Sequence, residues 1–320
     1  MTPSFRRVAI IYNPASGQHS ARRARAVSEV LAVLRAAGVE AQAFETECAG
    51  AGTLHAAEAV REGFDAVIAC GGDGTVHEVL QSLVGSEVAL GVIPLGTANA
   101  LAANLGLTGA PVKAARKLLD AKPERIPAGR IHYQNGDGNQ HSHYFLVAAG
   151  VGADALLMSR LDSGLKRRLG YVLYLIEAAR IWATHPFPLF TLEMPESENG
   201  AARVFEVSQL LAVRVRSFGG ALNHLAPGAT LLSNNLHLLA FRTRSRLRYM
   251  MFLLAVLAGK HTFKREVELV EASSVECRAR NGSKEKLFVE ADGEVLGWLP
   301  ARMEMVPQAV NLLIPPGAKP

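Results

Sequence analysis

Short apolar runs alternate with helical patterns over the first third of the chain. The runs at 7–12, 39–44, 66–70 and 89–93 have the length and β-branched content of buried strands. Between them, apolar residues recur at spacings of three and four, as Val27, Val30, Leu31 and Leu34 do, which predicts helices. This alternation predicts a Rossmann-like parallel sheet with helices on both faces.

The pattern changes near Pro123–Pro127, after which strands dominate. We expect a mainly antiparallel β-sandwich domain with helical insertions at about 165–184 and 245–258. The sequence therefore predicts an α/β plus all-β protein, divided into residues 1–125 and 126–320. The strands expected in the second part are 129–133, 143–148, 187–194, 203–215, 236–241, 266–270, 274–280, 286–290, 302–306 and 309–314.

One glycine-rich turn, Gly71–Thr75, follows a buried strand and opens a helix. Glycine lets the backbone approach a ligand closely, and the free N–H groups of a first helical turn suit phosphate. Asp73 is unusual there, because a bare carboxylate repels phosphate; it makes sense beside a magnesium ion. The alternative is a tight turn with an aspartate cap.

Two other special turns, Asn13–Gly17 and Gly96–Asn99, also lie where predicted strands end. The carboxyl ends of parallel strands share one edge of a sheet, where ligands bind in such folds. We therefore expect these two turns to converge with Gly71–Thr75 on one crevice.

Composition narrows the class of protein. A net charge of +5 and a pI of about 9.2 suit anionic partners, but only 6% aromatic residues speak against nucleic acid. The three cysteines, Cys48, Cys70 and Cys277, show no ligand spacing and favour a reducing compartment. No signal peptide is evident, and the longest apolar stretch, 250–258, is about half the ~20 residues of a membrane span. We expect a cytoplasmic protein.

Five motifs in order resemble the diacylglycerol kinase catalytic family, which includes bacterial lipid kinases and, more distantly, sphingosine and ceramide kinases. They are Asn13–Gly17, Gly71–Val79, Ile93–Asn99, Gly150–Ala155 and Asp292–Glu294. The resemblance covers nearly the whole chain and implies an α/β nucleotide domain, a β-sandwich and an active site between them.

The resemblance implies ATP-dependent phosphorylation of a lipid hydroxyl, usually that of diacylglycerol, giving phosphatidic acid. Asp292 would accept the proton, and Glu294 and Asp73 would place catalytic Mg²⁺ and the phosphates. The residues that would surround the nucleotide are Asn13, Pro14, Ala15, Ser16, Gly17, Thr46, Gly71, Gly72, Asp73, Gly74, Thr75, Val76, His77, Gly96, Thr97 and Asn99.

The chain departs from the family at a second metal site. Many bacterial members hold a structural magnesium with an Asp-Asp-Gly segment, but here Asn234 stands in place of the liganding aspartate. An amide oxygen supplies no charge to offset dehydration of the ion. We predict that this structural ion is weakly bound or missing, although Leu231 and Leu236 still offer backbone carbonyls.

Other interpretations stay open. Residues 291–294 also fit a simple hairpin turn, and His77 fits a packed or capping histidine as well as a phosphate donor. An NAD or sugar-phosphate kinase uses a similar glycine-rich turn, and a non-catalytic nucleotide- or lipid-binding protein could retain this scaffold.

Two segments join basic residues to an apolar helix face, Lys166–Ile176 and Arg242–Leu254. Such segments suit an anionic bilayer surface, where this chain would take a membrane lipid as its substrate. The alternative is that both apolar faces pack on the sandwich. We expect peripheral membrane contact and no nucleic acid partner, and leave a homodimer open.

Overall fold

The computed structural model describes residues 3–14, 20–95, 99–136, 138–160, 179–195, 202–218, 226, 228–257, 267–280, 286–318 and 320. The chain forms two compact units. Unit 1 comprises Met1–Ala128 and Pro307–Pro320, and unit 2 comprises Gly129–Val306. The sequence-based division, 1–125 and 126–320, differs from this one chiefly at the C-terminal end, where the last residues return to unit 1.

Unit 1 is built on a parallel sheet in the order β2-β1-β3-β4. The last residues of a long strand extend it, since Asn311 and Leu312 pair in parallel with Ala89 and Leu90. That pairing is why the C-terminal segment belongs to unit 1. The strands are β1 Arg7–Tyr12, β2 Glu40–Glu45, β3 Ala66–Gly71, β4 Ala89–Pro94 and β15 Glu294–Ile314.

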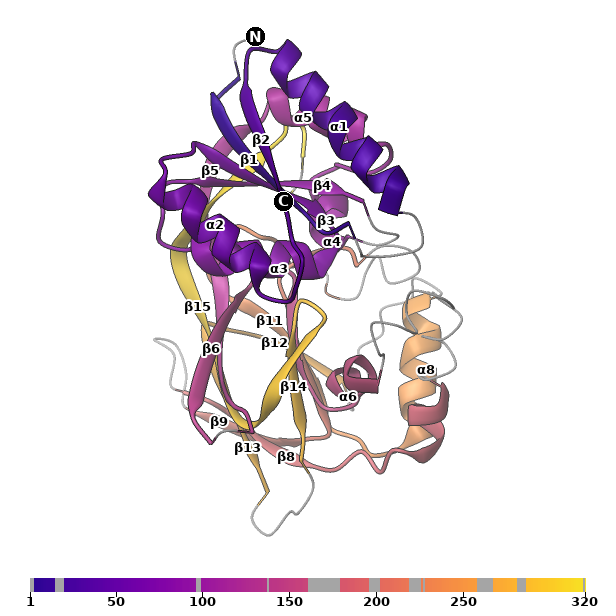
Figure 1. Ribbon diagram of the computed structural model, residues 1–320. Coiled ribbons are helices and arrows are strands. Elements are labelled where there is room, and N and C mark those ends of the chain that lie inside the picture. Colours follow the sequence, from indigo (N-terminus) through magenta and orange to yellow (C-terminus); the bar gives the residue numbers. More distant parts are fainter. Residues whose placement is uncertain are drawn as a thin grey trace. The chain divides into compact units, whose positions relative to one another are not determined.

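Five helices of unit 1 connect or flank these strands: α1 Ser20–Ala36, α2 Ala51–Arg61, α3 Asp73–Leu83, α4 Ala100–Asn104 and α5 Pro111–Leu119. Helices α1 and α5 pack together on one face of the sheet, and α2 and α3 pack on the other (Figure 1). The sheet is therefore buried on both sides, and every residue of β3 is buried. Strand order reverses between β1 and β3, which is where doubly wound sheets bind ligands.

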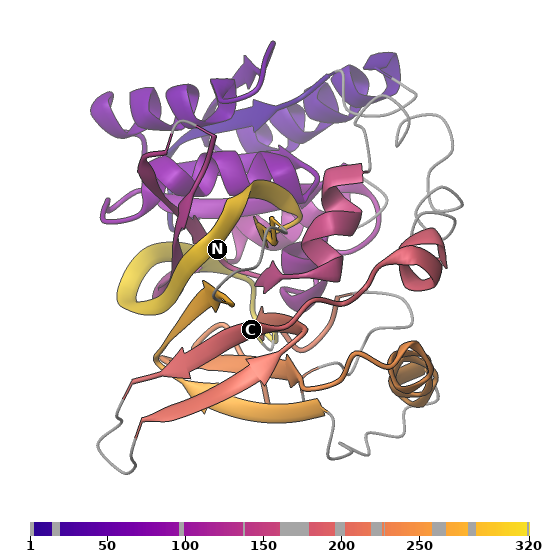
Figure 2. The same cartoon turned by 90° about the horizontal axis from the view of Figure 1, so that it is seen from below.

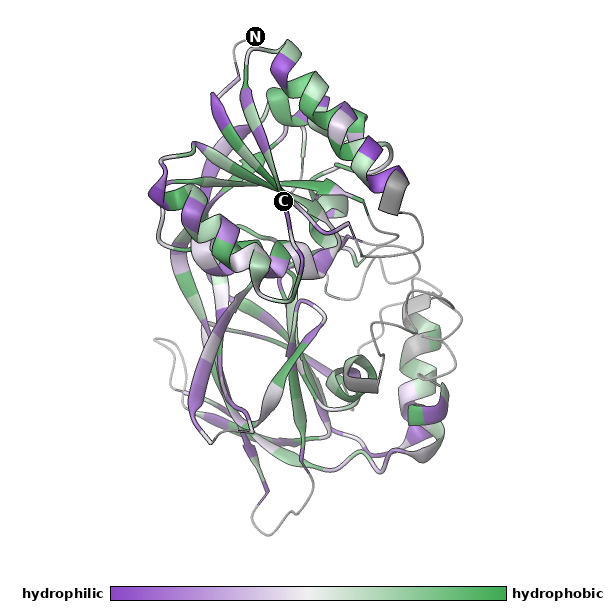
Figure 3. Ribbon diagram, viewed as in Figure 1, coloured by the Kyte–Doolittle hydropathy of each residue, from purple (hydrophilic) through white to green (hydrophobic). Residues whose placement is uncertain are grey.

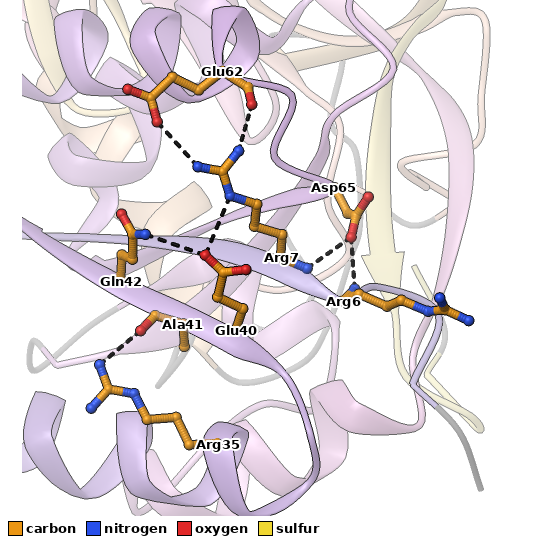
Figure 4. Close-up of polar contacts among 8 residues, drawn as sticks. All are labelled: Arg6, Arg7, Arg35, Glu40, Ala41, Gln42, Glu62 and Asp65. Atoms are coloured by element: carbon orange, nitrogen blue, oxygen red, sulfur yellow. Dashed lines mark hydrogen bonds and ion pairs between the residues drawn. The ribbon is translucent and has the colours of Figure 1, made fainter.

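The amino-terminal edge of this sheet is held by polar contacts around Arg7 (Figure 4). The Asp65 carboxylate accepts the backbone N–H groups of Arg6 and Arg7 at 2.7 and 2.8 Å. The Arg7 guanidinium lies 3.5 Å from Glu40 and 3.3 Å from Glu62. These contacts fix β1 beside β2 and β3 at the edge opposite the carboxyl ends.

Unit 2 is antiparallel, with strands in the order β12-β11-β10-β7-β14-β15 and further pairs β15–β13, β13–β8, β8–β9 and β5–β6. Figure 2 shows these strands from below. Their bounds are β5 Lys122–Gln134, β6 Gln140–Phe145, β7 Ala148–Val151, β8 Phe190–Met194, β9 Arg203–Val207, β10 Gln209–Val213, β11 Leu236–Phe241, β12 Val267–Ala272, β13 Ser274–Ala279 and β14 Phe288–Ala291.

In the described parts of unit 2, the helices are α6 Ala153–Arg160, a segment over 179–184, and α8 Arg246–Leu257. Helix α8 packs through aromatic rings: Tyr249 stacks on Phe241 at 5.0 Å, and Phe252 meets the same ring edge-on at 5.1 Å. Most of the expected helix at 165–184 lies outside the described residues.

Three expectations about elements need correction. The strand expected over 203–215 is two strands, because Ser208 breaks the ladder and donates its hydroxyl to Phe241 O at 3.2 Å. The segments at 302–306 and 309–314 form one continuous strand, β15. Helix α6 lies where no helix was predicted.

Buried apolar residues lie on strands of both units, where they alternate with hydrophilic positions on the less buried strands (Figure 3). The core of unit 2 combines residues from nearly all its strands, among them Phe145, Phe190, Leu210, Leu238 and Val289. Among the described residues, no helix combines the length and apolar character that a membrane crossing needs.

Candidate active site

The turn between β3 and α3 is shaped by its glycines. A side chain at Gly71 would overlap Thr75, whose Cβ lies 2.7 Å from the place of the missing atom. At Gly72, by contrast, no described atom lies within 4 Å of that place, and the φ of −92° suits any residue. Gly71 is thus required by packing within the protein, whereas Gly72 leaves open space in front of the first turn of α3.

Asp73 connects this turn to the next helix. Its Oδ1 accepts the backbone N–H of Ala100 at 3.1 Å, at the start of α4. Asn99 caps the same helix, since its Oδ1 accepts the N–H of Ala102 at 2.7 Å. Asp73, in the turn after β3, therefore lies beside the start of α4 and serves as a cap whatever else it does.

Glu78 caps a different helix from its own. Its two carboxylate oxygens accept the N–H groups of Gly50 and Gly52 at 3.0 and 2.9 Å, at the start of α2. The place of a Cβ at Gly52 lies 2.6 Å from Glu78 Oε2, so glycine is needed for this approach. The negative carboxylate lies at the positive end of the α2 dipole, which stabilises α2 and joins it to α3.

The turn after β1 is described as far as Asn13 and Pro14, both half-buried. Thr46 is buried beside it, with its N–H donating to Tyr12 O at 2.9 Å. Val76 and His77 are buried in α3, so Val76 offers a ligand its backbone alone. The structure supports a packed His77. The remaining expected contacts, Ala15, Ser16, Gly17, Gly96 and Thr97, lie outside the described residues.

Asp292 occupies a tight turn between β14 and β15. Both Asp292 and Gly293 have positive φ, 49° and 84°, as a two-residue hairpin turn of type I′ requires. The buried Asp292 carboxylate accepts three backbone N–H groups, those of Leu146, Val147 and Ala148, at 2.9, 2.8 and 3.1 Å. The hairpin interpretation of 291–294 is correct, and the carboxylate also holds a distant segment in place.

Glu294 begins β15 and is exposed, whereas Asp292 is buried. Among the residues that the structure describes, no three His, Cys, Asp or Glu side chains are placed to hold a metal ion. A magnesium ion that arrives with a nucleotide needs only one or two carboxylates, because phosphates and waters complete its shell. Asp73, beside the open face of Gly72, fits that role.

Sequence reasoning missed a buried acidic pair in unit 2. Glu290 on β14 and Asp154 on α6 both lie against the place of the missing Cβ of Gly150, which is 3.0 Å from Glu290 Oε1 and 2.8 Å from Asp154 Cγ. Burial raises the pKa of Asp154 to about 6 and the pKa of Glu290 well above its ordinary value. A charged residue inside an apolar run, as in Phe288–Ala291, was the available signal.

The residues expected around a structural magnesium are not arranged for one. Asn234 is exposed, and the carbonyl of Leu231 accepts a hydrogen bond from Arg214 at 2.9 Å. Leu236 begins β11 and pairs with Ala272. This donor set does not fit a magnesium ion in the described structure.

Two protein-family models and several curated proteins match this chain over most of its length. Residues 7–131 match the family model of the diacylglycerol kinase catalytic domain, and residues 146–314 match that of the YegS C-terminal NAD kinase beta sandwich-like domain. A diacylglycerol kinase of Mycobacterium tuberculosis is 31% identical over 97% of this chain and 95% of its own. One of Bacillus subtilis is 29% identical over 97% of both.

A probable lipid kinase, YegS-like, of Chromohalobacter salexigens is 32% identical over 91% of this chain and 89% of its own. The fold matches a crystal structure of a putative diacylglycerol kinase from Bacillus anthracis, with a TM-score of 0.77 and 20% identity over 99% and 98% of the two chains. The α/β and β-sandwich fold is therefore confirmed, and the chain belongs to the diacylglycerol kinase and YegS-like lipid kinase family.

Proposed function

We propose that this lipid kinase transfers the γ-phosphoryl group of ATP to the hydroxyl of diacylglycerol, giving phosphatidic acid. The observation that carries the proposal is the turn at Gly72 and Asp73, with open space at the glycine and a carboxylate beside it. The names of the relatives from Bacillus subtilis and Mycobacterium tuberculosis support diacylglycerol as the acceptor.

The nucleotide phosphates would lie against the start of α3. The free N–H groups there, with about half an elementary charge from the helix dipole, favour an anion. Gly72 would allow the phosphate to approach the backbone directly. Asn13 and Pro14, after the neighbouring strand β1, would border the same crevice.

Asp73 would supply the negative charge that holds magnesium beside the nucleotide phosphates. Magnesium neutralises phosphate charge in phosphoryl transfer when it is bound. In this chain Asp73 would hold the ion, and Glu294 is the second carboxylate proposed for it. The Oδ1 atom of Asp73 also keeps α4 in position.

Asp292 is the proposed proton acceptor. Phosphoryl transfer depends on positioning, so a base must be held rigidly beside the hydroxyl that it deprotonates. Three N–H groups fix the Asp292 carboxylate, and the positive φ of Asp292 fixes its backbone. The carboxylate would take the lipid hydroxyl proton as the oxygen attacks phosphorus.

The exposed face of α8 is the proposed membrane contact. Leu247, Met251 and Leu254 recur at helical spacing and are 68%, 44% and 56% exposed. Arginines 242, 244, 246 and 248 lie at the amino-terminal end of the same segment. An apolar stripe with a cationic rim favours an anionic bilayer, from which the kinase would take its lipid. The second basic segment, Lys166–Ile176, lies outside the described residues.

The test is transfer of labelled phosphate from ATP to diacylglycerol, sphingosine, ceramide or NAD in mixed micelles. We expect labelled phosphatidic acid, which disappears with Asp292→Asn while ATP binding persists. Asparagine tolerates the positive φ, and Glu206→Gln, an exposed change in the same unit, is the control. Labelling of NAD alone would favour a small-molecule kinase, and ATP binding without turnover would favour a binding protein.

A further inference from the structure

Arg214 is the most deeply buried charged residue among the described side chains, at 1% exposure. It follows β10, and its backbone N–H donates to Val147 O at 2.9 Å. Burial lowers its pKa to about 10, and the charge of Asp292 opposes that change. The guanidinium therefore stays positively charged near neutral pH.

This buried cation donates hydrogen bonds to backbone carbonyls of two separate segments. Its guanidinium donates to Leu231 O at 2.9 Å, Leu146 O at 3.3 Å and Phe145 O at 3.5 Å. Carbonyl oxygens that converge on a positive charge are also what a hard metal ion takes from a protein backbone. The guanidinium thus satisfies the oxygens that such an ion would otherwise bind.

The same backbone segment holds Asp292 from its other side. The carbonyl of Leu146 faces Arg214, while the N–H groups of Leu146, Val147 and Ala148 donate to the Asp292 carboxylate. The segment 145–148 is therefore fixed between a cation and an anion. Moving the guanidinium would shift the groups that position the carboxylate.

The turn that carries Leu231 is stabilised by hydrogen bonds among its own residues. The Ser233 N–H donates to Thr230 O at 3.1 Å, and the Asn235 N–H donates to the Ser233 hydroxyl at 3.0 Å. Asn234 is exposed and uncharged. A magnesium ion at ~2.1 Å from Leu231 O could lie no farther than about 5 Å from the guanidinium nitrogen on the same oxygen, where like charges repel.

We propose that the guanidinium of Arg214 replaces, in this chain, the structural cation of the β unit, and that it is a positioning residue for Asp292. One side chain ties the Leu231 turn to segment 145–148 and removes the need for a bound ion there. The role toward catalysis rests on the proposed function, whereas the replacement of the cation does not.

The first test uses thermal unfolding of the full chain without nucleotide or lipid. We expect the wild-type midpoint to be the same in EDTA and in magnesium chloride. The double variant Arg214→Ala, Asn234→Asp should unfold earlier in EDTA and recover with magnesium. Arg278→Gln, an exposed arginine beside Glu276, is the control and should resemble the wild type. These measurements do not depend on kinase activity.

The proposal is overturned if EDTA lowers the wild-type midpoint and magnesium restores it, or if metal analysis finds one tightly bound magnesium per chain. The comparison of the wild type in EDTA and in magnesium tests the proposal even if the double variant fails to fold.

The positioning role is tested with Arg214→Lys, which keeps the charge but loses the planar fork. We expect a lower kcat with an unchanged KM for ATP; an unchanged kcat contradicts it.

Discussion

The buried pair Asp154 and Glu290 predicts that unit 2 loses stability as the pH rises. An acid whose pKa is raised in the folded state holds its proton more tightly there than in the unfolded chain. The stability that such a protonated acid gives to the folded state is fully present below the pKa of the unfolded chain. It is lost as the pH rises through the pKa of the folded state. For Asp154 this window runs from 3.8 to about 6. Glu290 acts in the same direction, because burial also raises its pKa well above the ordinary value.

Asp154→Asn removes this dependence at one site. The difference between 3.8 and about 6 corresponds to about 3 kcal/mol of stability lost when the carboxyl group ionises. For a unit of this size, about 3 kcal/mol shifts the unfolding midpoint by ~6–12 °C. Since the two acids interact, the pair titrates together and Glu290→Gln should act in the same direction.

The assay is thermal unfolding of wild type and Asp154→Asn between about pH 4 and pH 8. As the pH rises, the unfolding midpoint of Asp154→Asn should increase relative to that of the wild type, by ~6–12 °C over the range. Glu206→Gln, an exposed change beside Arg280, should keep a constant offset. A constant offset for Asp154→Asn across the whole range would refute the reasoning, because it would mean that this carboxyl group does not exchange its proton on unfolding.

Three further predictions follow from unit 1 and α8. Glu78→Gln should cost about 1–2 kcal/mol in chemical denaturation, because the amide keeps one acceptor oxygen and turns its NH2 group toward the other N–H donor at the start of α2. Gly72→Ala should leave the unfolding midpoint unchanged and raise the KM for ATP about tenfold or more, since only a ligand meets the new methyl group. Leu247→Ser should weaken sedimentation with anionic vesicles, whereas Leu54→Ser, equally exposed on α2, should not. Equal binding of wild type to neutral and anionic vesicles at low salt would count against this contact.

The parallel sheet was predictable because each of its strands is a short apolar run followed by a helical period. The antiparallel unit was harder, because a period of two gives no sign of where one strand ends and another begins. Ser208 shows the difficulty: its hydroxyl bonds to Phe241 O, a residue that is distant in sequence. Likewise, the end of β15 belongs to unit 1 through tertiary contacts such as the pairing of Asn311 with Ala89, which the sequence pattern does not show.

The candidate site shows a similar limit. Sequence position identified Asp73 and Asp292 as acids in tight turns, because glycine beside an acid marks such turns. The sequence did not show what their carboxylates bind. Asp292 accepts N–H groups about 145 residues earlier in the chain, and Arg214 was indistinguishable from a solvated strand arginine. Such contacts depend on tertiary pairing, which local patterns do not encode.

Because Asp73 is also a cap, loss of activity in Asp73→Ala would not establish a role with the nucleotide. Asp73→Asn separates the two functions. The amide oxygen can still accept the Ala100 N–H, so the cap persists while the charge is removed. We expect Asp73→Asn to unfold at the wild-type midpoint with at least about a hundredfold lower kcat/KM, and Asp73→Ala to lose about 1 kcal/mol more in stability. If Asp73→Asn retains full turnover, Asp73 is a structural cap, and the charge that holds magnesium must come from another residue.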